Sequence, residues 1–398
     1  MTLRVALFTD SYPPQLNGVA LLLQRLVAAI RAREGAVRVF TTTDPAAPPE
    51  PDILRWPSVA FWAYPEHRLA LPMPGRVRRE LRAWGPTLIH AASPFGVGLA
   101  GRQAAHALGV PFVASYHTNW SAYSGYYGLG ALRNIAWPYL RWFHNGGLRT
   151  YCPTHSTEAE VQAHGIHHTA IWSRGVDAER FNPRHRSAAL RAELGVGDAA
   201  VLAVCVGRLG VEKGLDVALT GLHEVQARAR TRVVCAIAGD GPHADAYRQQ
   251  APPGTHFLGR LSGSALSELY ASGDVFLFPS TTDTFGNVLL EAMASGVPVV
   301  GADVGPTTEL LTAGGGVTFP QGNAHAFAAQ VIALADDPVR RHALAEAALA
   351  FARRCTWDRV FDDLIADYTR VIAGVAPAAA PAPPSTLLNP LPPSRLQH

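Results

Sequence analysis

The sequence predicts an α/β protein made of two parallel-sheet halves, and three observations support this. Strand-like apolar runs alternate with helix-like segments along most of the chain, which is typical of parallel sheets covered by helices. The alternation stops at "IWSRGVDAERFNP", residues 171–183, and then starts again. A length of 398 residues is enough for two domains, each with its own core. We therefore expect two Rossmann-like halves with a boundary near residues 172–184.

The first half should begin with a strand at "RVALFT", residues 4–9. A loop that contains Pro-Pro then leads to Gly18, and a helix should run from Val19 to about Arg33. Helical stretches join three further expected strands, which are "TLIHA" (87–91), "PFVASY" (111–116) and "RTYCP" (149–153).

The second half repeats the pattern and ends in a helix. Its expected strands are "AVLAVCVG" (200–207), "RVVCAIAG" (232–239), "HFLG" (256–259), "DVFLFPS" (274–280) and "VPVVG" (297–301). "FARRCTWDRVFDDLIADYTRVIAG", residues 351–374, predicts a final amphipathic helix. The Ala/Pro-rich tail from about Gly374 onward should be disordered.

Composition excludes several classes of protein. A charged fraction of 16% and a hydrophobic fraction of 48% are those of an ordinary globular protein, and a net charge of +3 is too small to indicate nucleic-acid binding. The N-terminus has no signal-peptide pattern, and no apolar run reaches about 18 residues, so we expect a cytoplasmic protein. The cysteines are scattered, which favours buried free thiols over disulfides or metal; they are Cys152, Cys205, Cys235 and Cys355.

Candidate functional residues follow predicted strands, where doubly wound sheets place their ligands. They are Asp10 and Gly18 after the first strand, His117, Arg208 and Lys213, and Asp283.

In "TTDTFGNVLLEAMASG", residues 281–296, Asp283 lies in a loop and Glu291 about one turn into a helix. Gly286 and Asn287 stand at that helix N-terminus, which favours an anion. The segment predicts a polyhydroxyl ligand that carries phosphate; alternatively, the Asp caps the helix and the Glu lies on its solvated face.

Two cations lie in "VGRLGVEKG", residues 206–214, and Lys213 is the only lysine of the chain. A cation at a helix N-terminus is unfavourable without an anion nearby. Arg208 and Lys213 can therefore clamp a diphosphate and neutralise the charge that grows as it leaves. The alternative is that Lys213 only decorates the first turn of a helix.

Three other motifs differ in what they predict. "AGDGPHA", residues 238–244, matches a dinucleotide loop only loosely, so an oxidoreductase is disfavoured. The cluster of His164, His167 and His168 has no carboxylate or cysteine to complete a metal site and is expected in a surface loop. His117 in "SYHTN" follows a strand and could bind a sugar hydroxyl or phosphate, or could be a satisfied core histidine.

Two stretches mix arginine with aromatic residues. They are "RVRRELRAW", residues 76–84, and "LRNIAWPYLRWFHNGGLRT", residues 132–150. Such stretches can lie on an anionic membrane surface, or they can be helices with core aromatics and solvated arginines.

Five spaced motifs together carry a family resemblance. They are "DSYPPQLNGVA" (10–20), "SYHT" (115–118), "GRLGVEKG" (207–214), "PSTTDTFGNVLLEAMASGVPVV" (279–300) and "TWDRVFDDLIADY" (356–368). From about Leu3 to Ile372 the chain resembles glycosyltransferase family 4, retaining enzymes of the GT-B fold. It departs from the family's E-x7-E pattern because Asp283 replaces the first Glu. "YPEHRLALP", "HAASPFGVG" and "YLRWFHN" resemble the bacterial GDP-mannose-dependent α-mannosyltransferases and sulfoquinovosyl-diacylglycerol synthases.

The resemblance implies roles for the donor-side residues. Glu291 would hold the ribose hydroxyls of a sugar nucleotide, and Asp283 would meet hydroxyls of the transferred sugar. The sugar and the diphosphate would be lined by backbone N–H groups of Phe285, Gly286 and Asn287.

Further roles implied by the resemblance surround the leaving group. Arg208 and Lys213 would stabilise the departing diphosphate, Gly18 would let the N-terminal loop approach it, and His117 would contact the sugar from the opposite side. The base would lie near "LGRLSG", residues 258–263, which contains Arg260 and Leu261.

The resemblance also implies an organisation and a mechanism. GDP-mannose is the favoured donor and a UDP-sugar the next, while the acceptor is a lipid or lipid-linked glycan, possibly on the inner face of the cell membrane. Retention would give an α-linkage, with the leaving phosphate taking the acceptor proton. The expected domains are an acceptor domain (1–172), a sugar-nucleotide domain (173–356), a closing helix that returns to the first domain (357–373) and a disordered tail (374–398).

Metal and cofactors are not expected, because the chain has no Asp-x-Asp motif and two cations can do the work of a metal. The rival class is a non-catalytic binder of sugar nucleotides or glycans on the same fold. A phosphorylase with a lysine-linked cofactor is disfavoured, since Lys213 belongs to the clamp.

Overall fold

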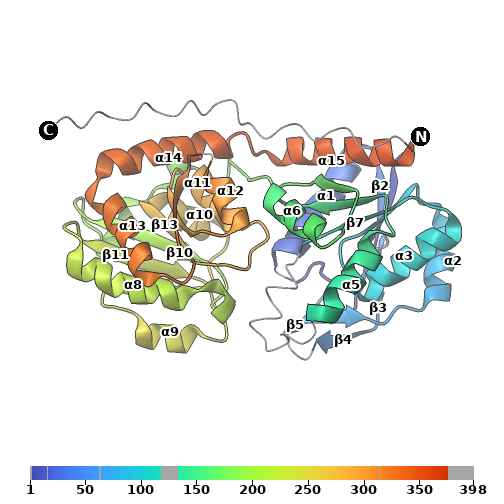
Figure 1. The fold of residues 1–398 in the computed structure, drawn as a ribbon, viewed down its shortest axis with the longest axis horizontal. Coiled ribbons are helices and arrows are strands. Elements are labelled where there is room, and N and C mark those ends of the chain that lie inside the picture. Colours follow the sequence, from blue (N-terminus) through green and yellow to red (C-terminus); the bar gives the residue numbers. More distant parts are fainter. Residues whose placement is uncertain (1, 16, 62–63, 118–132, 313, 375–398) are drawn as a thin grey trace.

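A computed structural model of the chain describes residues 2–15, 17–61, 64–117, 133–312 and 314–374. These residues form two parallel sheets with helices packed on them, which confirms the predicted α/β class (Figure 1). The tail that was predicted to be disordered lies, apart from Gly374, outside the described residues.

The described part of the first half forms a sheet of seven strands in the order β3-β2-β1-β6-β7-β8-β9, with every pair parallel. The strands are β1 (Arg4–Phe8), β2 (Ala36–Thr42), β3 (Ile53–Trp56), β6 (Leu88–Ala91), β7 (Phe112–Ser115), β8 (Arg149–Cys152) and β9 (Thr169–Ile171). An antiparallel hairpin, absent from the sequence prediction, consists of β4 (Ser58–Phe61) and β5 (Tyr64–Ala70).

Helices connect the strands of the first half. They are α1 (Gly18–Ala32), α2 (Pro74–Trp84), α3 (Gly96–Leu108), α5 (Arg133–His144) and α6 (His155–Ala163). Helix α1 begins where predicted because Asn17 caps it: the Asn17 side chain accepts the N–H groups of Val19 and Ala20.

The second half forms a six-stranded parallel sheet in the order β12-β11-β10-β13-β14-β15. Its strands are β10 (Val201–Val206), β11 (Val233–Ala238), β12 (Thr255–Gly259), β13 (Val275–Phe278), β14 (Val299–Ala302) and β15 (Gly316–Phe319). Its α-helices are α7 (Ala188–Glu193), α8 (Leu215–Arg228), α9 (Ala244–Gln250), α10 (Gly263–Ser272), α11 (Asn287–Ala294), α12 (Gly305–Leu311), α13 (Ala324–Asp336) and α14 (Pro338–Ala352). Two short 3₁₀ helices are η2 (Pro183–His185) and η3 (Val211–Lys213).

The central strands are apolar throughout because helices cover both faces of each sheet. In β1, Val5 and Leu7 pack with α1, whereas Ala6 and Phe8 pack on the opposite face with residues of α3. The second sheet is covered in the same way, because alternate residues of β10 enter separate core clusters. A continuous apolar run therefore predicts each central strand.

The last helix, α15 (Trp357–Ile372), returns from the second half to the first. Its apolar stripe, spaced by three or four residues, enters the core around α1; the stripe is Phe361, Leu364, Tyr368 and Val371. Figure 1 shows α15 lying beside α1, while α14 lies over the second sheet.

The outgoing and returning connections between the halves run side by side. Val176 forms a parallel bridge with Thr356, and the Val176 N–H donates to the carbonyl of Cys355 at 2.8 Å. A Cβ on Gly175 would lie 2.5 Å from the backbone nitrogen of Trp357, so this approach requires glycine. The pairing fixes where the chain crosses from one half to the other.

Candidate active site

Loops that follow strands of both sheets meet between the halves. The Thr284 hydroxyl, after β13, donates to the carbonyl of His117, after β7, at 2.8 Å. Gly18 begins α1 and Asn287 begins α11, and a Cβ on Gly18 would lie 3.4 Å from Nδ2 of Asn287. The N-termini of two helices therefore face each other. Both present the positive end of a helix dipole to an anion, although in α1 the Asn17 side chain already accepts the N–H groups of Val19 and Ala20.

Arg208 follows β10 and is held by a carboxylate that the sequence analysis did not single out. Its Nη2 lies 2.5 Å from Oε1 of Glu212, whose side chain is only 1% exposed. A Cβ on Gly210 would lie 2.5 Å from the second Glu212 oxygen, so glycine makes room for this carboxylate. A charge-assisted contact of this kind fixes the direction of the guanidinium before any ligand binds.

The loop after β11 supports the loop that carries Arg208. The Leu209 N–H donates to the carbonyl of Asp240, and the His243 N–H donates to the carbonyl of Leu209. A Cβ on Gly241 would lie 2.6 Å from the Leu209 oxygen. The glycines of "AGDGPHA" therefore serve loop packing, which explains the loose resemblance to a dinucleotide motif.

Lys213 ends η3 and forms an ion pair with Asp283. Its Nζ lies 2.8 Å from both carboxylate oxygens, and both side chains are about one-quarter exposed, 23% and 24%. The Ser280 hydroxyl also donates to Asp283, at 2.5 Å. Burial alone would raise the pKa of Asp283, but the Lys213 charge and the hydrogen bonds from Lys213 and Ser280 outweigh it and lower that pKa. The anion that Lys213 needs is thus supplied by the chain itself.

Glu291 lies on α11, one turn beyond the facing helix N-termini, and accepts a hydrogen bond from the Tyr270 hydroxyl at 2.9 Å. Burial raises the pKa of Glu291, an effect that the Tyr270 hydrogen bond and the charges of Arg180 and Arg25 partly oppose. Arg25 belongs to α1 of the first half. Glu291 therefore does not lie on a solvated face. Within the described part of the chain no side-chain cap, from Asp283 or any other residue, forms at α11.

His117 is nearly buried, with 9% of its surface exposed. Its Nδ1 lies 3.0 Å from Nη2 of Arg174, and its ring meets Trp172 edge-on at 5.3 Å. Burial lowers the pKa of His117 well below the ordinary 6.5, and the neighbouring Arg174 charge lowers it further. His117 is therefore neutral at physiological pH.

Asp10, at the end of β1, is buried beside the start of α3. One carboxylate oxygen accepts the N–H groups of Ala70 at 3.3 Å and Val97 at 3.5 Å. Burial raises its pKa to about 7, although these hydrogen bonds lower it. Gly96 is needed here because a Cβ would lie 2.5 Å from the carboxylate.

The predicted base-binding residues lie in a loop of the second half. Arg260 and Leu261 lie between β12 and α10, at the edge of the second sheet, two strands away from β10. Arg260 is exposed, and Leu261 is partly buried against the core. The Phe285 side chain is also buried, so only its backbone is placed toward the start of α11.

Several aromatic residues of the two arginine-aromatic stretches take part in internal packing, whereas the arginines of α2 are exposed. The Trp84 ring lies under the guanidinium groups of Arg4 and Arg38, and Arg149 is buried in an ion pair with Asp367. Phe143 and Trp137 are core residues. Trp142 remains half exposed, at 49%, beneath Arg102.

The remaining predictions concern the histidine cluster, metal binding and membrane spans. The His164 ring stacks on Trp137 with centroids 3.7 Å apart. Among the described residues, no group of three His, Cys, Asp or Glu side chains could hold a metal ion, and no helix is long and apolar enough to cross a membrane.

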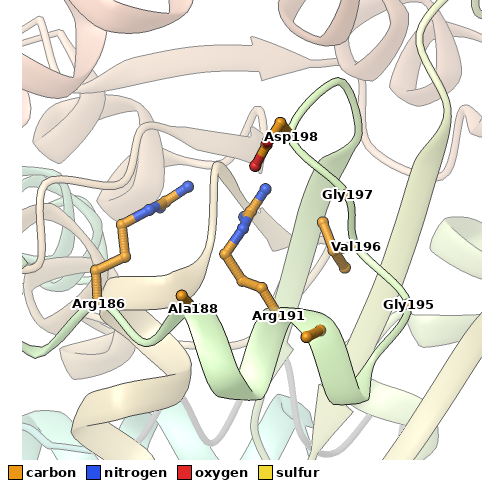
Figure 2. A pocket seen from close by; sticks show the side chains of 8 residues that line it. Arg186, Ala188, Arg191, Gly195, Val196, Gly197 and Asp198 are labelled. Carbon is orange, nitrogen blue, oxygen red and sulfur yellow. The ribbon is translucent and has the colours of Figure 1, made fainter.

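A hollow of about 750 Å³ lies beside α7 and contains none of the predicted site residues (Figure 2). Arg186 and Arg191 line it, but each donates to Asp274, at 2.7 and 2.8 Å. These arginines therefore fasten α7 to the segment before β13 rather than await a ligand.

Sequence reasoning missed four residues that hold the site: Glu212, Tyr270, Ser280 and Arg174. Glu212 and Ser280 are close in sequence to their partners, because Glu212 stands four residues after Arg208 and Ser280 three residues before Asp283. Tyr270 and Arg174 contact partners 21 and 57 residues away, at separations that no local pattern encodes.

Comparisons with known proteins cover most of the chain. Residues 16–180 match the family model described as "Glycosyltransferase Family 4", and residues 200–337 match "Glycosyl transferases group 1". The chain is similar to GDP-mannose-dependent alpha-mannosyltransferases of Corynebacterium glutamicum (32% identity, 93% of this chain, 90% of the relative) and Mycobacterium tuberculosis (34%, 92% and 97%).

More distant similarities agree. An alpha-monoglucosyldiacylglycerol synthase of Streptococcus pneumoniae is 28% identical over 75% of this chain and 70% of its own. Among solved structures, a sucrose-phosphate synthase from Thermosynechococcus elongatus has a TM-score of 0.74 at 19% identity and covers 94% of this chain and 100% of its own. That likeness shows a shared GT-B fold.

Proposed function

Because this chain belongs to glycosyltransferase family 4 and is a hexosyltransferase, we propose that it moves mannose from GDP-mannose to a lipid or lipid-linked acceptor with retention of the α-configuration. One observation carries the choice of donor: the chain is 32–34% identical, over more than nine-tenths of its length, to enzymes named as GDP-mannose-dependent. A UDP-sugar is the next candidate.

The geometry supports a division of labour around the leaving group. The diphosphate of the donor lies between the facing starts of α1 and α11, where Gly18 and Asn287 approach each other. Arg208 and Lys213 stabilise its charge as the bond from the sugar C1 to the phosphate oxygen breaks. The acceptor hydroxyl bonds to C1 on the same face, and its proton passes to the departing phosphate oxygen. No metal is needed for this route.

Sugar and ribose contacts complete the proposal. Asp283 binds hydroxyls of the transferred sugar while it keeps Lys213 in place. Glu291 accepts hydrogen bonds from the ribose through Oε1, because the Tyr270 hydroxyl donates to the other carboxylate oxygen, Oε2. His117 contacts the sugar from the first half, and the base lies beside Arg260 and Leu261.

The proposed acceptor is a lipid because a similar enzyme is named for a glucosyldiacylglycerol product and because apolar side chains are exposed on the first half. Leu71 and Met73, just before α2, are 58% and 56% exposed, and four exposed arginines follow on that helix: Arg76, Arg78, Arg79 and Arg82. Basic residues beside apolar ones suit an anionic membrane surface.

The donor is tested by thermal shift with GDP, UDP and ADP, followed by turnover of the matching sugar donors. We expect GDP to raise the melting temperature most, and GDP-mannose to be consumed only when an acceptor is present. A ligand at one hundred times its dissociation constant adds about 2.7 kcal/mol of stability, enough to be detected. Stabilisation by UDP alone, with turnover of a UDP-sugar, would replace mannose while leaving the family assignment intact.

A further inference from the structure

His117 is gripped by Arg174, a residue of the segment that connects the two halves. Nη2 of Arg174 lies 3.0 Å from Nδ1 of His117, and the Arg174 side chain is itself buried. Its other terminal nitrogen, Nη1, donates to the backbone carbonyls of Trp172 and Ser173. The guanidinium also lies 5.4 Å from the Trp172 ring and 5.8 Å from the Phe285 ring. Its position is therefore fixed from several sides.

This contact determines which nitrogen of His117 carries the proton. A guanidinium has only N–H donors and no acceptor. Nδ1 of His117 must therefore accept the hydrogen bond with its lone pair, so it carries no hydrogen. In a neutral ring the proton then lies on Nε2. Among the described residues, Nε2 is buried and has no hydrogen-bond partner.

Burial and the charge of Arg174 both disfavour a second proton on the His117 ring. Two other histidines interact with it, His90 on β6 and His144 on α5, but burial lowers the pKa of each to about 3, so both are neutral and add no charge. Burial also lowers the pKa of Arg174, to about 9, which leaves it charged at neutral pH. Arg174 is thus the charged group that repels a proton from Nδ1.

We propose that Arg174 is a positioning residue, which holds His117 as a neutral ring protonated on Nε2 and so makes it a hydrogen-bond donor to the transferred sugar. The inference rests on the proposed contact between His117 and that sugar. It assigns His117 no role as a general acid or base, because the ring neither gains nor loses a proton during transfer. A residue of the segment that connects the two halves would thus orient a side chain of the sugar site.

The first test is a double-mutant cycle on transfer rates. Arg174→Met keeps an unbranched side chain against Trp172 and Phe285 but removes the donor. We expect it to lower kcat/KM about a hundredfold, the usual cost of losing one oriented donor. His117→Gln keeps an amide N–H near the Nε2 position but has no ring tautomer for Arg174 to select. In that background, Arg174→Met should cost less than about threefold, because the two side chains act as one unit.

Controls separate this role from a structural one. Arg184→Met alters an exposed arginine of the same segment, whose side chain pairs with Glu179 at the surface, and should leave kcat/KM unchanged. Arg174→Lys keeps a charge and a donor and should recover part of the lost rate. An equal cost of Arg174→Met in both backgrounds would overturn the proposal in favour of a purely structural arginine.

The second test reads the tautomer without any turnover. In ¹⁵N-labelled unaltered protein, the imidazole signals that vanish in His117→Gln identify His117. We expect an unprotonated Nδ1, a protonated Nε2 and no titration between pH 5.5 and 8. In Arg174→Met burial still keeps the ring neutral, but the proton should be shared between Nδ1 and Nε2, because nothing then holds the Nδ1 lone pair. A proton on Nδ1, or a titration of the unaltered protein in that range, would overturn the proposal. If the tautomer is as expected but no sugar donor is consumed, the proposed function fails and the tautomer assignment stands.

Discussion

At the scale of single residues, each cation of the predicted clamp has its own carboxylate. Arg208 is held by Glu212 and Lys213 by Asp283. A fixed partner orients each cation before the diphosphate binds, so less side-chain entropy is lost on binding. Asp283 therefore has two roles: it holds Lys213 of the clamp in place, and it lies at the proposed sugar site.

Removing either clamp cation should nearly abolish transfer. We expect Lys213→Met and Arg208→Met each to lower kcat about a hundredfold, since one oriented charge at a leaving group is typically worth about 3 kcal/mol. Steady-state kinetics with the matching donor measure the loss, and a melting curve confirms that the fold survives. Near-normal turnover in both variants would refute the clamp.

The two carboxylates of the donor loop should separate in their effects. Glu291→Gln should weaken binding of the nucleoside diphosphate about tenfold, as expected for one hydrogen bond to a charged group. Asp283→Asn should spare or tighten that binding, because it removes the negative charge that Lys213 neutralises, while it damages transfer. Calorimetric titration with GDP provides the measurement, and equal loss of affinity in the two variants would contradict this division.

Local pattern predicted most of this site but not its internal pairing. Asp283, Glu291 and Lys213 were found because they follow apolar strands or stand out in composition. That Lys213 meets Asp283 depends on η3 and the β13 loop lying side by side, 70 residues apart in the chain. A Cβ on Gly214 would lie 2.6 Å from the Pro279 carbonyl, and this close approach has no sequence signature beyond a glycine.

At the scale of elements, α15 is fastened to the first sheet by buried polar contacts as well as by its apolar stripe. Arg149 on β8 pairs with Asp367 at 3.1 Å, and the Tyr151 hydroxyl donates to the same carboxylate at 2.8 Å. Nδ1 of His90 lies 2.6 Å from the Tyr368 hydroxyl. Such directional contacts select one seating of the helix along the sheet.

Breaking the buried pair should therefore destabilise the protein strongly. Asp367→Asn leaves Arg149, which is 2% exposed, without its charged partner, and we expect a loss of about 3–5 kcal/mol in the free energy of unfolding. Asp362→Asn on the same helix removes an exposed contact to Arg33 and should cost less than about 1 kcal/mol. Urea unfolding of the two variants measures the difference, and similar losses would show that burial does not govern this pair.

The elements themselves differed in how well the sequence predicted them. The central strands and α15 were clear because burial on both faces, or on one stripe, imposes a strict pattern. The β4–β5 hairpin was not predicted, since it lies outside both parallel sheets and the second strand, "YPEHRLA", is interrupted by polar and charged residues. Edge strands such as β9 and β15 are short and only partly buried, so their signal is weak.

At the scale of the whole molecule, the halves touch away from the clamp as well. The Glu309 carboxylate on α12 accepts the N–H groups of His155 and Ser156, at 3.0 and 2.8 Å, at the start of α6. A carboxylate at the N-terminus of a helix in the opposite half is an electrostatically favourable contact. This contact and the Thr284–His117 hydrogen bond both hold the second half against the first.

The first half should bind anionic membranes through α2. We expect the charge-reversing pair Arg78→Glu and Arg79→Glu to reduce co-sedimentation with vesicles that contain anionic lipid, because each exposed arginine contributes about 1 kcal/mol near such a surface. Binding of the unaltered protein should also fall with added salt, which screens exposed charges beyond about 10 Å at 0.1 M.

The matched control places the same charge change on the other half. Arg340→Glu with Arg353→Glu alters two exposed arginines of α14 and its end, and should leave vesicle binding unchanged. Equal losses in the two double variants would point to net charge alone. If the unaltered protein ignores anionic vesicles and glycosylates a soluble acceptor efficiently, the lipid proposal fails.

The position of Lys213 beside Asp283 also allows ligand binding to be followed by chemical labelling. Since the chain contains one lysine, an amine-directed acylating reagent has a single side-chain target, and that target stands in the proposed donor site. The ion pair should keep the ammonium protonated and slow to react, and a bound nucleotide should shield it further. The mass gained by one peptide, followed over time, would then report site occupancy without a labelled substrate.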